Sequence, residues 1–241
     1  MSDREMINLI QFRPMASPPQ SAVVLTFDLE GFSRFYSHPD VQDYVTKYLN
    51  RILGCLSVCI HGGWAYWLEG GTQMSPLPAP VHQKFLGDGA MYLWTVPEKH
   101  EQAPRVDMVV LLNRLWNLKN NFDQVVRACA DDVPVVDLPR RIRFGLAAGS
   151  VYELSYEKGE ATEYIGYCIN LASRLERYCK DLGFIASARL GIPEKELDEH
   201  GYVKVIAKKL YGFPKEMVVV ERKEFNQLNP GVRDDLFDRI H

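Results

Sequence analysis

The sequence predicts one large domain of the α+β class. With 241 residues, of which 46% are hydrophobic, the chain can bury a full core. A run of β-branched and aromatic residues that starts at Ala22 predicts a buried strand. Two later segments, residues 40–59 and roughly 106–130, place apolar residues at helical spacing. Sheet and helix therefore both contribute to the predicted core.

The central prediction concerns the stretch AVVLTFDLEGFSRF, residues 22–35. Its apolar run ends on Asp28, and Gly31-Phe32-Ser33 then opens a new segment, so we expect a carboxylate at the end of a strand beside a tight turn. Such a carboxylate can hold a cation. If a helix follows, the free N–H groups around Gly31 and Phe32 would face a phosphate chain. The alternative role for a single aspartate there is a turn cap.

The helix predicted over residues 40–59 presents Tyr44 and Tyr48 on its buried face. A tyrosine can fill a core and can also offer its hydroxyl to a ligand. Residues 62–81 contain four glycines and three prolines, which predict a long connection. The following stretch KFLGDGAMYLW, residues 84–94, predicts two strands joined by a tight turn that contains Asp88. A plain hairpin turn is the alternative.

The second half of the chain predicts a strand over residues 141–154, a hairpin arm at 155–162 and a helix that begins near Gly166. On that helix, Asn170 and Arg174 are one i, i+4 step apart, so they share a face and could present donors to one ligand. A solvated arginine is the alternative. A strand at 184–188, a short helix after Pro193 and a final pair of strands, 203–210 and 217–220, complete the fold, and we assign residues 1–20 to an N-terminal arm, 21–222 to the domain and 223–241 to a tail.

Composition argues against several classes of function. The net charge of −3 and the lack of a long basic run argue against nucleic acid as the main partner. No apolar run approaches the about 18 residues of a membrane span, and we expect neither a signal peptide nor a membrane partner, with the cytoplasm as the location. The histidines lack the spacing of a zinc site. We expect buried free thiols at Cys55, Cys59, Cys129, Cys168 and Cys179.

Taken together, the motifs FDLEGFS, KFLGDGAMYLW and YIGYCINLASRL resemble, in this order, the catalytic domain of class III nucleotidyl cyclases over residues 22–220. The resemblance implies a ferredoxin-like βαββαβ core and a head-to-tail homodimer in which each active site takes residues from both chains. It also implies the activity of a phosphorus-oxygen lyase, with two Mg²⁺ or Mn²⁺ ions as cofactors.

The resemblance also assigns roles to residues of this chain. Asp28 and Asp88 would bind the metal ions, together with the carbonyl group of Leu29. The backbone at Gly31 and Phe32 would face the phosphates. Asn170 would orient the ribose, and Arg174 would stabilise the α-phosphate in the transition state. A lysine that binds phosphate is left open among Lys208, Lys209 and Lys215.

Lys84 and Glu163 align with a lysine and an aspartate that recognise adenine in the adenylate cyclases of this family. The longer sequences around the motifs, however, are more similar to those of the Pycsar pyrimidine cyclases of bacterial antiphage defence. That resemblance implies that UTP, ahead of CTP, is converted to the 3′,5′-cyclic monophosphate, a messenger for a separately encoded effector protein. We expect Tyr48 to shorten the base pocket and Lys84 to donate to a pyrimidine carbonyl. Two alternatives are a purine cyclase of the same fold and a non-catalytic nucleotide-binding dimerisation module.

Overall fold

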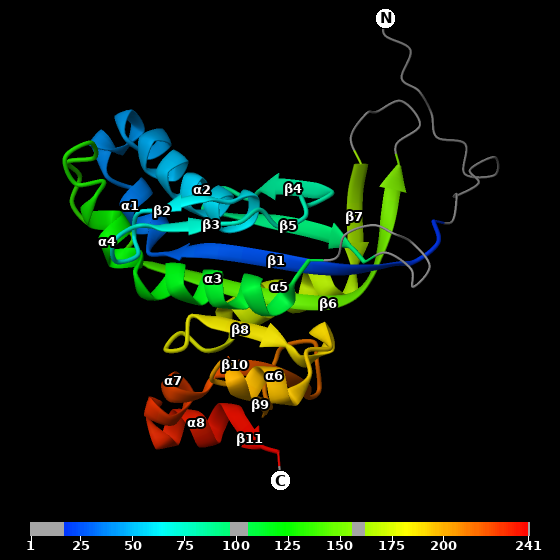
Figure 1. Ribbon diagram of the computed structural model, residues 1–241. Helices are drawn as coiled ribbons and strands as arrows, with labels where there is room; N and C mark the ends of the chain where they lie inside the picture. The colour runs from blue at the N-terminus through cyan, green and yellow to red at the C-terminus, as the bar shows by residue number, and fades with distance from the viewer. Residues whose placement is uncertain (1–16, 97–105, 156–161, 241) are drawn as a thin grey trace, which may run out of the picture.

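The computed structural model describes residues 17–96, 106–155 and 162–240 (Figure 1). Its centre is the strand β1 (Gln20–Glu30), which pairs antiparallel with β5 (Gly89–Thr95) on one side and with β6 (Arg141–Ser155) on the other. Among the described residues, nine strands form one sheet in the order β11-β9-β10-β8-β6-β1-β5-β4, and β7 pairs with β6. β1 is therefore hydrogen-bonded along both edges, which fixes the position of the residues at its end.

The core of this sheet has the βαββαβ arrangement. Along the chain, the elements of this core come in the order β1, α2 (Val45–His61), β4 (His82–Phe85), β5, α3 (Met108–Asn120) and β6, with shorter elements between them. In the sheet, the four strands lie in the order β4-β5-β1-β6 and neighbours are antiparallel. This arrangement confirms the expected ferredoxin-like α+β core.

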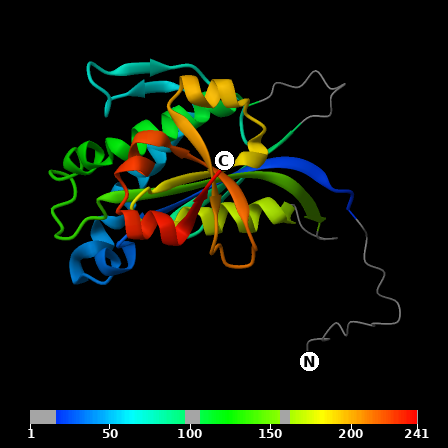
Figure 2. The ribbon, with the colours of Figure 1, turned by 90° about the horizontal axis from the view of Figure 1, so that it is seen from below.

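Successive residues of β1 face opposite sides of the sheet, as the period of a strand requires. Val23, Leu25, Phe27 and Leu29 are buried in one cluster with side chains of α2 and α3. Ala22 and Val24 are buried on the other side, with side chains of α5 (Tyr167–Tyr178). Figure 2 shows α5 and α3 on opposite sides of the sheet. By this alternation Asp28 lies on the α5 side.

The close packing of α5 against the sheet depends on Gly145 of β6. A Cβ atom at this position would lie 1.9 Å from the carbonyl oxygen of Ala172 and 2.7 Å from the backbone nitrogen of Glu176. Any other residue would push the helix away from β6. Gly145 thus controls the distance between α5 and the strands that carry Asp28.

The C-terminal residues form part of the fold. β8 (Phe184–Ser187) pairs parallel with β6 and antiparallel with β10 (Glu216–Glu221). The remaining elements there are η2 (Ala188–Leu190), α6 (Glu194–Glu199), β9 (Tyr202–Ala207), α7 (Arg222–Gln227), α8 (Pro230–Leu236) and β11 (Phe237–Arg239). The segment that we assigned to a tail therefore contains two helices and an edge strand, which pairs with β9.

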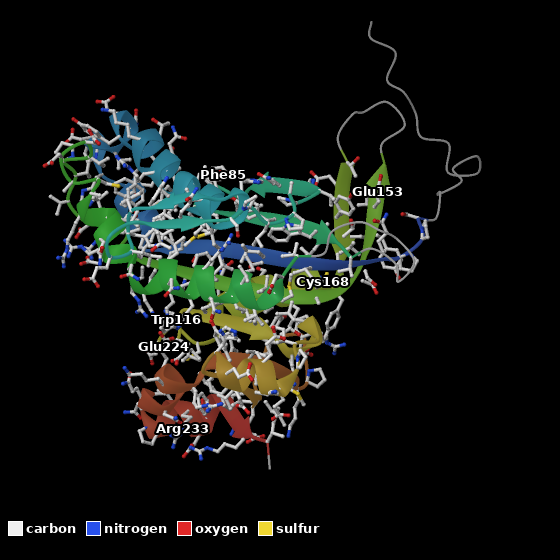
Figure 3. The ribbon with its side chains drawn as sticks, in the orientation of Figure 1. Phe85, Trp116, Glu153, Cys168, Glu224 and Arg233 are labelled. Atoms are coloured by element: carbon white, nitrogen blue, oxygen red, sulfur yellow. The ribbon has the colours of Figure 1, made fainter. Side chains whose placement is uncertain are left out.

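Glu224 of α7 ties this C-terminal part to the core. Its Oε1 atom accepts hydrogen bonds from the indole of Trp116 at 3.1 Å and from Lys119 at 2.6 Å. Trp116 of α3 and Glu224 of α7 are labelled in Figure 3. Lys119 also donates to the carbonyl of Leu182 at 2.9 Å. Most of the Lys119 side chain is buried, so these partners offset the cost of burying its charge.

Three further details differ from the sequence-based expectation or refine it. The helix expected over residues 106–130 is broken at Asn121 into α3 and α4 (Phe122–Arg127). The long connection contains a short hairpin of β2 (Gly63–Ala65) and β3 (Thr72–Met74). Of the expected arms, residues 1–16 and 156–161 lie outside the described residues.

The other elements are α1 (Phe32–Tyr36), η1 (Pro39–Asp43) and β7 (Thr162–Gly166).

In the parts of the chain that the structure describes, no helix combines the length and the apolar character that crossing a bilayer requires. All five cysteines are free and buried, as expected.

We predict that Gly145→Ala destabilises the protein by about 1–3 kcal/mol or more, because the new methyl group collides with the backbone of α5. Gly54→Ala is the matched control. Gly54 lies inside α2, and a Cβ atom there would meet no atom within 4 Å, so alanine should stabilise the helix by about 0.5–1 kcal/mol. Urea unfolding of both variants measures the difference. Equal stability of Gly145→Ala and wild type would show that α5 has room to move.

Candidate functional site

Asp28 and Asp88 meet at the end of β1. Asp28 pairs in register with Gly89, the residue after Asp88, and the N–H of Leu29 donates to the carbonyl of Asp88 at 3.2 Å. The pairing of β1 with β5 thus brings together two carboxylates that are far apart in the sequence. Both line a cavity of about 240 Å³ with Leu29, Gly31, Phe32, Ser33, Arg143 and Arg177.

The two carboxylates repel each other. Burial raises the pKa of Asp88 above its ordinary value, and the charge of Asp28 raises it further. Asp28 itself is only 5% exposed. A pair of acids in this setting is stabilised by a positive charge between or beside them.

Arg143 supplies one such charge. It lies on β6 directly opposite Asp28, and its terminal NH2 group donates to the Oδ2 atom of Asp28. Its side chain is only 11% exposed, and its Nε–H is buried without a hydrogen-bond partner in the described structure. Arg143 was not predicted as a site residue. The sequence RIRFG does predict that Arg143 lies in a strand. Only the register of this strand with β1 shows that Arg143 lies opposite Asp28.

The turn after β1 has the expected conformation. Gly31 has φ = 87°, in the left-handed region that favours glycine, and its carbonyl accepts the N–H groups of Arg34 and Phe35, each at 3.1 Å. The first N–H groups of a helix have no partner within it, so those of Phe32 and Ser33 are available beside the cavity. Gly31 and Phe32 thus lie where the sequence placed them, next to Asp28.

Asn170 and Arg174 lie on α5 but do not line this cavity. Both side chains are exposed, and the guanidinium of Arg174 lies over the ring of Tyr211, 5.0 Å from its centre. The structure of one chain therefore does not bring these two residues together with Asp28 and Asp88.

The last turn of α5 does reach the cavity, through Arg177. The Nε–H of Arg177 donates to Oε1 of Glu176 at 3.2 Å. Glu176 is 4% exposed, and burial together with the charge of Asp28 raises its pKa to about 7. Neither residue was singled out from the sequence, because the apolar stripe of the helix predicted only core or solvent at these positions.

Lys84 and Glu163 are brought together from β4 and β7. The ammonium group of Lys84 donates to Oε1 of Glu163 at 2.5 Å, and the Nε2 atom of His82 lies 4.0 Å from Oε2 of the same carboxylate. The lysine lowers the pKa of Glu163 through its hydrogen bond. This pair is separate from the cavity at Asp28.

Tyr48 lies in the core, which corrects its assignment to a base pocket. The residue is fully buried, its ring contacts that of Phe35 at 5.3 Å between centres, and its hydroxyl donates to the carbonyl of Pro139 at 2.5 Å. Burial raises the pKa of Tyr48 strongly. A side chain enclosed in this way has no free surface for a ligand.

The three candidate lysines near the C-terminus all face acids of the last elements. Lys208 and Lys215 approach Asp238 at 3.2 and 3.6 Å, and Lys209 pairs with Asp235. Lys208 also donates to the carbonyl of Asp234. These contacts do not single out one lysine as a phosphate ligand.

The residues at the end of β1 fit a divalent metal ion. Two carboxylates and a backbone carbonyl are hard oxygen donors, which Mg²⁺ and Mn²⁺ prefer. Burial and the charge of Asp28 raise the pKa of Asp88, and a cation would offset both effects. Within residues 17–96, 106–155 and 162–240, no three His, Cys, Asp or Glu side chains cluster as a metal site. Water and substrate phosphates would have to complete the coordination, as they commonly do for Mg²⁺.

We predict opposite effects of two isosteric changes on the stability of the protein in excess chelator. Asp28→Asn should destabilise it by on the order of 3 kcal/mol, because buried Arg143 loses its counter-charge. Asp88→Asn should leave stability equal or higher at neutral pH, because ionisation of the raised-pKa Asp88 costs stability as pH rises through its pKa and asparagine cannot ionise. Thermal unfolding measures both. A stable Asp28→Asn protein would show that Arg143 does not depend on Asp28.

Comparisons with known proteins support the fold. No protein-family model matches the chain, and no curated protein matches it. Solved structures do. The guanylyl cyclase Cya2 is 19% identical and matches with a TM-score of 0.55, over 86% of this chain and 93% of the other. The adenylyl cyclase CyaB from P. aeruginosa is 17% identical, with a TM-score of 0.54 over 86% and 96%. A bacterial light-regulated adenylyl cyclase is 15% identical, with a TM-score of 0.56 over 86% and 92%. The chain therefore has the fold of class III nucleotidyl cyclase domains.

Proposed function

We propose that this protein is a nucleotidyl cyclase, which converts a nucleoside triphosphate to a 3′,5′-cyclic monophosphate and pyrophosphate. The observation on which this rests is the pairing of Asp28 with Asp88 beside the N–H groups of Phe32 and Ser33, at the end of the central strand of a cyclase fold. Carboxylates for cations next to amides for phosphates form a site for a metal-bound triphosphate.

The reaction joins the ribose 3′-oxygen to the α-phosphate as pyrophosphate leaves. When bound by Asp28, Asp88 and the carbonyl of Leu29, two Mg²⁺ or Mn²⁺ ions would activate this oxygen and offset phosphate charge. The chain itself would position the phosphates through the turn at Gly31 and the N–H groups of Phe32 and Ser33, and Arg143 would place a buried guanidinium beside them. Positioning and electrostatics are the main contributions that a protein makes to phosphoryl transfer.

The site would be completed by a second copy of the chain. The cavity of about 240 Å³ is below the roughly 300–1,000 Å³ of pockets that enclose a drug-sized ligand, so it suits only the metal and phosphate end of a nucleotide. Asn170 and Arg174 are exposed and outside it. A head-to-tail homodimer would place Asn170 of one chain at the ribose and its Arg174 at the α-phosphate of a nucleotide held by the other chain.

For the base we propose a pyrimidine, UTP ahead of CTP, on the resemblance of the motifs to pyrimidine cyclases. Lys84 would donate to a carbonyl of the base. In this proposal the buried Tyr48 does not contact the base.

A purine cyclase is the second candidate. Lys84 and Glu163 lie together, a donor beside an acceptor, and such a pair can also recognise the edge of adenine. In either case the cyclic product would serve in the cytoplasm as a messenger for a separate effector protein, and for a pyrimidine product the resemblance suggests antiphage defence.

We predict that the purified protein with Mn²⁺ forms a cyclic monophosphate from UTP, more slowly from CTP, and least from ATP and GTP. Mass analysis of the products of each triphosphate measures this. Asp28→Asn and Asp88→Asn should abolish turnover, whereas Asp132→Asn should keep it, because Asp132 is exposed and lies outside the cavity. A preference for ATP or GTP would select the purine candidate, and no product from any of the four would contradict the proposed function.

A mixing experiment tests the shared site. Asp28→Ala and Arg174→Ala proteins should each be inert, but a heterodimer of the two contains one intact site, with both lesions in the other. With free exchange about half of the dimers are mixed and half of their sites are whole, so about a quarter of wild-type activity should return. Differently tagged chains must first show that subunits exchange. Exchange without recovery of activity would mean that Asp28 and Arg174 serve a site within one chain.

A further inference from the structure

We infer that Arg177 binds the phosphate chain of the nucleotide that its own chain holds at Asp28 and Asp88. This inference rests on the proposed function and adds a residue to it. Arg174, one turn earlier on α5, would serve the partner's site, so one helix would contribute arginines to two different sites.

The position of Arg177 follows from the packing of α5. The helix covers the face of the sheet on which Asp28 lies, and Gly145 allows its backbone to approach β6 closely. Its last turn therefore reaches the end of β1, and Arg177 lines the same cavity as Asp28, Asp88 and Arg143. No movement of the helix is needed to bring Arg177 to the cavity.

Glu176 restricts how Arg177 can be used. The buried Glu176 carboxylate accepts a hydrogen bond from the Nε–H of Arg177 at 3.2 Å. This bond fixes one edge of the guanidinium and does not use the N–H donors of its two terminal nitrogens. The Arg177 side chain is 64% exposed, which leaves its outer edge open to a ligand. Two parallel N–H donors of a guanidinium match two oxygens of a phosphate.

The charges in the cavity support the same role. Its side chains are two carboxylates and two guanidiniums, so their formal charges cancel. Divalent ions at Asp28 and Asp88 would make the cavity positive and suited to a polyanion. Without Arg177 the side chains alone would carry a net negative charge, which opposes a phosphate chain. The simpler alternative is an arginine that serves only to pair with Glu176.

A binding experiment separates these two roles. Calorimetry with inorganic pyrophosphate and Mn²⁺ needs no turnover and no base. Arg177→Gln should weaken binding about tenfold or more, because a charge-assisted hydrogen bond is lost. Arg177→Lys should retain part of the affinity. The matched control is Lys180→Gln, because Lys180 is exposed, lies two residues beyond the end of α5 and does not line the cavity. Equal affinity of Arg177→Gln and Lys180→Gln would overturn the inference.

Mixing of inactive chains tests whether Arg177 acts within its own chain. If it does, Arg177→Glu mixed with Arg174→Ala should regain about a quarter of wild-type activity, because one site in each heterodimer is intact. Arg177→Glu mixed with Asp28→Ala should stay at background, because each site then carries one lesion. The reverse pattern would assign Arg177 to the partner's site and overturn the inference.

The two experiments keep this inference distinct from the proposed function. If wild-type protein binds pyrophosphate with Mn²⁺ but forms no cyclic nucleotide, the proposed function fails while the binding of Arg177 to phosphate is still measured. If cyclic nucleotide forms and Arg177→Gln binds pyrophosphate as wild type does, only the inference about Arg177 fails.

Discussion

Asp28 is subject to two opposed electrostatic contacts, and the candidate site depends on the balance between them. Arg143 approaches its carboxylate from β6, and Asp88 repels it from the turn before β5. Both neighbours are positioned by main-chain pairing, since Asp28 is opposite Arg143 on one edge of β1 and opposite Gly89 on the other. The strand order of the sheet therefore sets the charges around the site. A shift of either neighbouring strand by one residue would turn its side chain to the other face and remove the arrangement.

The placement of α5 adds a second constraint. This helix is held close to β6 by the lack of a side chain at Gly145, and it is amphipathic enough to bury one face and expose another. Its exposed face carries Asn170 and Arg174, whereas its last turn approaches the carboxylates of the same chain. Under the proposed function, this geometry explains why a single chain holds the parts of two half-sites and no complete one.

Local sequence patterns were sufficient to predict the strand that carries Asp28, the turn that contains Asp88 and the turn at Gly31, because short motifs mark each of these places. The strands of the core and the helix of Asn170 were predicted for the same reason. Arg143 was not, because its role depends on a register between segments far apart in the chain. Tyr48 was misassigned because helical spacing shows that a side chain faces inward but not whether a cavity lies there. The final helices and β11 were assigned to a tail because each is short, so the residues that they bury, such as Phe225 and Phe237, form no long periodic pattern in the sequence.

The strand β6 connects two separate parts of the candidate site. Near its start this strand carries Arg143 at the phosphate end, and near its end it pairs with β7, where Leu154 lies opposite Glu163. One continuous hydrogen-bonded strand connects these two positions. Under the proposed function, the phosphates would bind beside Arg143 and the base beside Glu163 of β7, so β6 would connect the two ends of the nucleotide-binding surface of one chain. If the proposed dimer divides these two ends between its two sites, this strand would give it a direct mechanical route for cooperativity.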